Sequence, residues 1–151
     1  MRTFSLLARD QHGQSLVEFA LLLPIMVFLI LAGGDMARGY AIQIAIQNGA
    51  RAGAEAAAID YTPTKLETEN RARDEMSRTP GMDGQVPGVV VKFHGGDFND
   101  GSCAADPPTY VQPCFATVEV TMTWRTITAW PLIPNTFNFD RQTTMRMLAK
   151  G

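Results

Sequence analysis

Residues 14–34 read QSLVEFALLLPIMVFLILAGG, and this stretch decides the fold class of the chain. Sixteen consecutive residues between Glu18 and Asp35 carry no charge. As an α-helix, residues 16–34 would be about 28 Å long, close to the hydrocarbon core of a bilayer at about 30 Å. We therefore expect residues 14–34 to form a transmembrane helix segment that spans a membrane once.

A short polar leader, residues 1–13, precedes this segment and indicates its orientation. The leader carries Arg2 and Arg9 against Asp10. Positive charges before a span favour a cytoplasmic N-terminus. We expect a single-pass protein whose residues 35–151 form an extracytoplasmic α+β domain, which includes the outer half of a long helix.

Composition excludes several functions. The 151 residues hold 13 Lys and Arg against 15 Asp and Glu, which leaves no basic stripe for a nucleic acid. No nucleophile elbow, phosphate-binding Gly loop or His paired with a nucleophile is present in the sequence. We therefore expect no enzyme, no cofactor, no metal and no small-molecule substrate.

Three kinds of N-terminal signal fit the apolar segment. A secretory signal peptide would be cut after Gly34, and a plain signal anchor would stay uncut. A prepilin-type signal would be cut between Gly13 and Gln14, so that the apolar helix stays on the mature protein. Glu18 separates these readings, because a carboxylate in an apolar span is costly. The cut after Gly13 would create a positive α-amine four residues before Glu18, with which its carboxylate could pair.

The same segment resembles a known family. The residues that carry the resemblance are Gly13-Gln14-Ser15-Leu16-Val17-Glu18-Phe19, Ala20-Leu21-Leu22-Leu23-Pro24, the pair Asp35 and Arg38, and Asn48-Gly49-Ala50-Arg51-Ala52-Gly53-Ala54. In this pattern the chain is similar to the TadE-like pseudopilins of tight-adherence, or Flp-type, pilus systems. The resemblance covers roughly residues 10–58. Gln14 stands where many type IV pilins carry Phe.

The resemblance implies a place and a set of partners. It implies a minor pilin or pseudopilin of the bacterial inner membrane, acting in pilus biogenesis and cell adhesion. The partners would be the membrane, a prepilin peptidase, other pilins or pseudopilins and the pilus assembly platform. The residues it assigns to subunit assembly are Glu18, Phe19, Pro24, Asp35 and Arg38.

Periodicity predicts that the helix continues far beyond the membrane, over residues 15–59. One face of the outer half carries Gln43, Gln47, Arg51 and Glu55, and the opposite face carries Ile42, Ile46, Gly49, Gly53 and Ala57. The Gly-x-x-x-Gly spacing permits close approach of another helix or a sheet, within the chain or between subunits. Pro24 predicts a kink or local melting near residues 20–24, or an ordinary membrane-helix proline. Asp35 and Arg38 have the spacing of an ion pair.

The rest of the outer domain predicts a second helix and a small sheet. Thr62-Pro63-Thr64 ends the long helix, and residues 65–78 are expected to form a short one. Alternating patterns predict strands at 88–94, 115–128 and 137–148. We expect an antiparallel meander of about three strands packed on the long helix, a pilin-like α+β fold.

The loop between the first two strands holds both cysteines and several acids. Cys103 and Cys114 are the only cysteines, and an oxidising location predicts a disulfide between them. The loop at 95–106 carries Asp97, Asn99, Asp100 and Asp106, which resembles an oxygen-rich calcium loop without EF-hand spacing. Turn formation by Gly, Asn and Asp is the favoured explanation.

Overall fold

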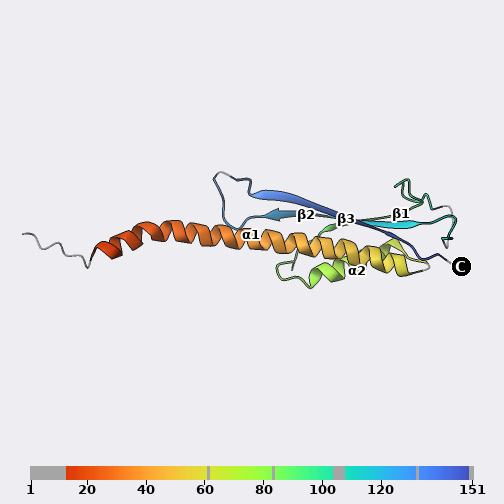
Figure 1. Cartoon of the computed structure of the whole chain (residues 1–151), viewed down its shortest axis with the longest axis horizontal. Coiled ribbons are helices and arrows are strands. Elements are labelled where there is room, and N and C mark those ends of the chain that lie inside the picture. Colours follow the sequence, from red (N-terminus) through yellow and green to blue (C-terminus); the bar gives the residue numbers. More distant parts are fainter. Residues whose placement is uncertain (1–12, 61, 83, 104–107, 132, 150–151) are drawn as a thin grey trace, which may run out of the picture.

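The computed structural model describes residues 13–60, 62–82, 84–103, 108–131 and 133–149. The elements in chain order are α1 (Gln14–Ile59), α2 (Lys65–Ser77), β1 (Gly88–His94), β2 (Phe115–Arg125) and β3 (Thr136–Arg146). The sheet lies along the C-terminal half of α1, while the N-terminal half projects beyond the domain (Figure 1). The expected α+β fold is confirmed. The expected leader lies outside the described residues, except for Gly13.

The sheet is the antiparallel meander that the alternating patterns predict. Its order is β1-β2-β3, so that β2 is the central strand. His94 pairs with Phe115 across β1 and β2, and Arg125 pairs with Thr136 across β2 and β3. Alternate side chains on one face of the central strand are all buried, namely Ala116, Val118, Val120, Met122 and Trp124.

The predicted packing face of α1 is also confirmed. Ile42, Ile46 and Ala57 belong to the buried core, and Gly49 and Gly53 are buried on the same face. A Cβ added at Gly49 would lie 2.5 Å from the side chain of Met76, and one at Gly53 would lie 3.1 Å from that of Ala72. The Gly-x-x-x-Gly surface is therefore occupied by α2 within the same chain, as small residues permit close approach of two helices.

The second helix begins at the expected turn. Thr64 is its N-cap, and its hydroxyl accepts a hydrogen bond of 3.2 Å from the backbone N–H of Glu67. The Glu67 carboxylate accepts in return from the backbone N–H of Thr64. This reciprocal pair is a capping box, which fixes where a helix starts. The helix ends at Ser77, with Arg78 as its C-cap rather than its last residue.

Two strands end earlier than the patterns predict. The expected strand at 115–128 stops at Arg125. The N–H of Thr126 still donates to the carbonyl of Asn135, but those of Ile127 and Thr128 turn to Asp35 of α1. The expected strand at 137–148 stops at Arg146. Beyond it, the N–H of Met147 donates to the carbonyl of Cys114, and the N–H of Leu148 donates to that of Ala58. Single backbone hydrogen bonds thus continue one residue past both ends, although the regular strand pairing stops at Arg125 and Arg146.

The helix is continuous through Pro24. The expected local melting at residues 20–24 is therefore not found. Figure 1 shows α1 curving in this N-terminal part, as a proline inside a helix favours. The proline is accommodated within one uninterrupted rod.

Candidate functional site

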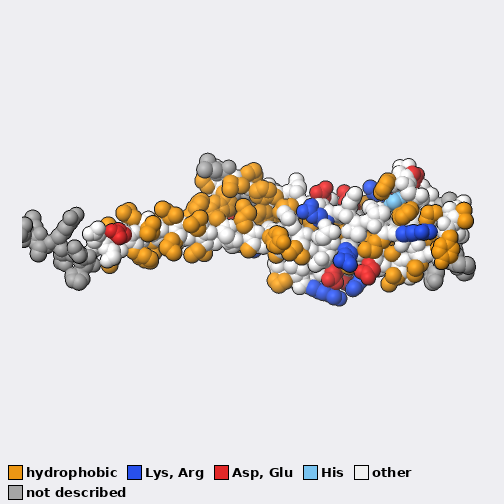
Figure 2. All heavy atoms as spheres, viewed as in Figure 1, with side chains coloured by type: hydrophobic (Ala, Val, Ile, Leu, Met, Phe, Trp, Pro, Cys, Tyr) orange, Lys and Arg blue, Asp and Glu red, His pale blue; other side chains and the backbone are white. Residues whose placement is uncertain are grey.

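The N-terminal half of α1 is an apolar rod that the described part of the chain leaves largely uncovered. Every residue from 13 to 31 is exposed, and Figure 2 shows hydrophobic side chains along the length of this projecting part. By length and composition, α1 is apolar enough to cross a membrane. Such a surface is stable only in lipid or against other apolar surfaces.

The expected processing site falls at the beginning of this rod. Gly13 is the N-cap of α1, and its carbonyl accepts a hydrogen bond from the backbone N–H of Val17. One turn into the helix, the Glu18 carboxylate accepts a hydrogen bond of 3.2 Å from the side-chain amide of Gln14. Gln14 and Glu18 therefore share a face, and Phe19 beside them is exposed.

Asp35 joins α1 to the loop between β2 and β3. Its side chain is only 4% exposed. One carboxylate oxygen accepts from the backbone N–H of Ile127 at 3.0 Å, and the other accepts from the N–H of Thr128 at 3.2 Å. The indole N–H of Trp130 donates to the second oxygen at 3.2 Å. A buried carboxylate needs such donors, and three of them come from a single loop.

These contacts set the charge state of Asp35. The hydrogen bond from the backbone of Ile127 is the largest cause that lowers the pKa of Asp35 below its ordinary value of 3.8, and the bonds from Thr128 and Trp130 act in the same direction. Burial opposes them, and the Arg38 guanidinium contributes least. The expected Asp35–Arg38 ion pair is present at 3.3 Å. Arg38 nevertheless lowers the pKa of Asp35 least, because the carboxylate is held mainly by its hydrogen bonds to the loop.

The same loop packs on the apolar rod through an aromatic pair. The rings of Trp130 and Phe28 meet edge to face with centroids 4.8 Å apart. Trp130 is 8% exposed, so its indole is nearly enclosed between the loop and the helix. A small cavity of about 80 Å³ beneath the loop is lined mostly by apolar side chains, including Ala32 and Ile133.

A second, wider hollow lies between α1 and β3. This apolar groove has a volume of about 390 Å³ and is lined by Met36, Gly39, Tyr40, Gln43, Trp124, Phe137 and Phe139. The indole N–H of Trp124 is buried and has no hydrogen-bond partner among the described residues. Because the exposed Met36 lines the groove, the groove continues the exposed apolar surface of the rod onto the outer domain.

Comparison with known proteins finds one family match, which falls on this helix. The model of TadE-like proteins matches residues 13–55. This segment is TadE-like. No curated protein and no solved structure matches the chain. The TadE-like match begins at Gly13 and ends four residues before the end of α1. With this match, the one helix among the described residues that is apolar enough to cross a membrane suggests membrane anchoring.

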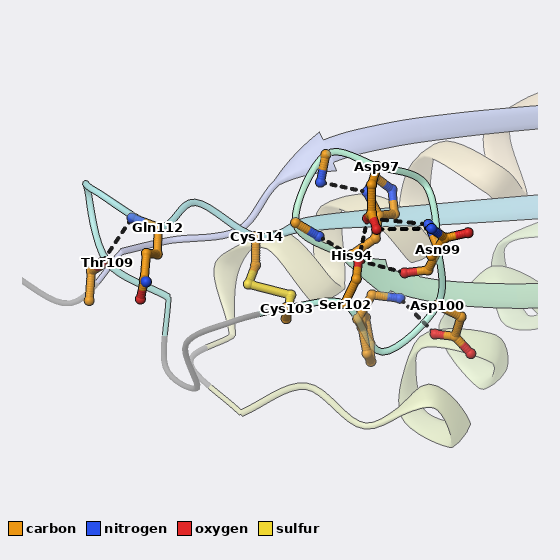
Figure 3. The surroundings of a disulfide bond; sticks show 12 residues. His94, Asp97, Asn99, Asp100, Ser102, Cys103, Thr109, Gln112 and Cys114 are labelled. Atoms are coloured by element: carbon orange, nitrogen blue, oxygen red, sulfur yellow. Dashed lines mark hydrogen bonds between the residues drawn. A yellow bond between two sulfur atoms is a disulfide. The ribbon is translucent and has the colours of Figure 1, made fainter.

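Outside the TadE-like segment, the far end of the sheet is held by a disulfide. Cys103 and Cys114 are bonded, with Cα atoms 5.5 Å apart (Figure 3). The adjoining acids stabilise turns: Asp97 accepts from the backbone and the side chain of Asn99, and Asp100 accepts from the N–H of Phe93 and from Lys65. The expected loop member Asp106 lies outside the described residues.

The only histidine after the leader serves the packing of the sheet. His94 is buried, and its Nε2 lies 2.8 Å from the hydroxyl of Thr117. The ring of Phe98 covers it with centroids 4.9 Å apart. Among the described residues, no group of three or more His, Cys, Asp or Glu side chains could hold a metal ion.

The structure brings some of the expected assembly residues together and separates others. Glu18 and Phe19 lie at one end of the TadE-like segment, while Asp35 and Arg38 lie about 26 Å away along the helix axis. The partners of Asp35 in the β2–β3 loop were missed by sequence reasoning. The available signal was an uncharged stretch at 126–135 with one Trp and two Pro, which is unusual for a solvent loop.

Proposed function

We propose that this chain is a minor pilin or pseudopilin of a Flp-type pilus machine. It is inserted in the bacterial inner membrane with its N-terminus in the cytoplasm and residues 35–151 outside. A prepilin peptidase cuts it between Gly13 and Gln14, and it then acts in pilus biogenesis and adhesion. The observation that carries the proposal is the TadE-like match on a helix whose apolar N-terminal half the described chain leaves largely uncovered.

In this function the apolar rod gives up its contacts with lipid and packs against other pilin helices. Lipid and helix surfaces are similarly apolar, so that packing and polar contacts decide the outcome. Glu18 supplies the polar contact: after cleavage the new α-amine of Gln14 lies one turn away. The carboxylate then pairs with its own terminus or with that of a neighbouring subunit, which sets the register of assembly.

The apolar groove between α1 and β3 supports contacts between subunits in the outer domain. Met36 and Tyr40 stand exposed on its rim, next to the outer end of the apolar rod. A neighbouring helix that packs along the rod would meet this groove next. The proposed assembly surface therefore extends along exposed residues of α1 from Gln14 to Gln43.

The assembly role is tested by Glu18→Ala in the full chain, expressed with its pilus machine. We expect normal insertion and cleavage, but loss of piliation and surface attachment. Glu55→Ala is the matched control, since Glu55 is an exposed acid of the same helix outside the membrane, and it should leave piliation intact. Normal piliation with Glu18→Ala would contradict the register role.

Processing is tested by N-terminal sequencing of the protein extracted from membranes. The proposal requires a mature start at Gln14. A start at Met1 would indicate an unprocessed single-pass anchor whose outer domain binds a partner. A start at Asp35 would indicate a secreted β-rich binding domain, which would have lost the contact between Phe28 and Trp130.

A further inference from the structure

We propose that the loop at 126–135, between β2 and β3, inserts into the outer interface of the lipid bilayer and holds the domain against the membrane. The inference rests on the membrane anchoring of α1 proposed above. It assigns a lipid-contacting role to a segment far from that helix in sequence. Four observations carry it: position, exposed chemistry, internal hydrogen bonding and the direction of one indole.

The loop reaches down beside the membrane helix. Trp130 contacts Phe28, and Phe28 precedes Asp35 by seven residues, or about 10 Å of helix. From Glu18 to Asp35 the rise is about 26 Å, which is less than the roughly 30 Å hydrocarbon core. If Glu18 lies at the inner boundary of the hydrocarbon core, Asp35 lies at its outer boundary. The loop attached to Asp35 then lies at the depth of the lipid headgroups.

The exposed surface of the loop is apolar. Ile127 is 75% exposed and Ile133 is 44% exposed, and Pro131 and Pro134 are exposed beside them. No charged residue occurs between Arg125 and Asp140. A solvent loop gains nothing from these side chains, whereas burial at a bilayer surface stabilises them. This apolar surface continues that of the rod.

Four backbone N–H groups of the loop donate to partners within the chain, which lowers the cost of placing them in a lipid environment. The N–H groups of Ile127 and Thr128 donate to Asp35. The N–H of Trp130 donates to the Asn135 side chain at 2.7 Å, and the N–H of Thr126 donates to the Asn135 carbonyl at 3.1 Å. Both prolines lack an N–H group altogether. These four donors and the two prolines therefore present no free N–H group to the surroundings of the loop.

Trp130 has the direction of an interfacial tryptophan. Its N–H points to Asp35, at the outer end of the apolar rod, while its ring contacts Phe28 inside the rod. Tryptophan is enriched at membrane interfaces because its polar end and its apolar body prefer different sides. Here the polar end is already paired with a carboxylate, so that the side chain anchors the loop at this depth.

The test places a fluorescent label at three exposed positions of the full chain, in liposomes of phosphatidylethanolamine and phosphatidylglycerol. The single variants are Ile127→Cys, Val111→Cys and Ile25→Cys. Both native cysteines are disulfide-bonded, so the label reacts at the new thiol. Val111 is 90% exposed at the far end of the sheet and is the matched apolar control. Ile25 lies in the rod and reports insertion itself.

We expect the label at 127 to be quenched severalfold more by a lipid-bound nitroxide than the label at 111, and severalfold less by aqueous iodide. Equal iodide quenching at 127 and 111, with the label at 25 protected, would overturn the inference while anchoring stands. Iodide access at 25 would overturn the anchoring and the inference together. A label at 127 shielded from both quenchers would identify another copy of the chain as the occupant, and would also overturn it.

Discussion

Trp130 is the side chain whose removal should release the β2–β3 loop. Trp130→Ala deletes a nearly buried indole, its edge-to-face contact with Phe28 and its hydrogen bond to Asp35. Replacing a core aromatic by Ala costs about 3–5 kcal/mol. Because this site lies at the surface and can relax, we expect the low end of that range.

The measurement is hydrogen exchange at the backbone amides of Ile127 and Thr128, which exchange when the loop opens locally. A loss of about 3 kcal/mol corresponds to roughly 150-fold faster exchange, since 1.36 kcal/mol is tenfold. Trp130→Phe keeps a ring but loses the indole N–H, for which we expect a loss of about 1 kcal/mol, or roughly fivefold.

The control is Tyr110→Ala, which truncates an exposed aromatic side chain far from the loop. It should leave the exchange of both amides unchanged. If Trp130→Ala also left them unchanged, the aromatic contact would not hold the loop, and the reasoning from burial would be refuted. Faster exchange across the whole domain in Trp130→Ala would likewise contradict a local latch.

Three further predictions concern charge, packing and the disulfide. Because the pKa of Asp35 is lowered, its contribution to loop attachment is complete above pH 3.8 and is lost as the pH falls through the lowered pKa. Trp fluorescence measured against pH should show this transition. The variant Asp35→Asn should abolish it. Gly49→Leu overpacks the contact with α2 and should lower the free energy of chemical unfolding by about 1–3 kcal/mol. Gly34→Leu should leave it unchanged, because a Cβ at Gly34 has nothing within 4 Å. Equal losses in the two variants would contradict intramolecular packing at Gly49. Cys103→Ser should lower the free energy of unfolding by about 2–3 kcal/mol, and its stability should equal that of the wild-type chain measured in reductant. If reductant left the stability of the wild-type chain unchanged, this would argue against a structural bond at Cys114.

The order and type of the elements follow from short-range patterns in the sequence. An uncharged run, a four-residue periodicity and strict alternation each act locally, so they predict α1, α2 and the three strands. The packing face of α1 follows for the same reason: Ile42, Ile46 and Gly49 repeat at helical spacing and are buried together. Thr64 and Glu67 specify the start of α2 by themselves.

The contacts of Asp35 could not be predicted in this way. Its partners are 92 and 93 residues further along the chain at Ile127 and Thr128, and two of its bonds are to backbone groups that every residue possesses. No residue type marks such a donor. Arg38, by contrast, lies three residues away, so the local ion pair was visible while the stronger tertiary contact was not. The end of β2 was misplaced for the same reason.

The unbroken course of α1 has a mechanical consequence. About 69 Å of helix runs from Gln14 to Ile59 without a hinge, and the portion beyond Asp35, about 36 Å long, is fixed to the sheet through its buried face. A tilt of about 10° imposed on the apolar end would displace the distal end of the domain by about 6 Å relative to Asp35. A neighbouring subunit that tilts the apolar end of α1 would therefore reorient the outer domain as a rigid body.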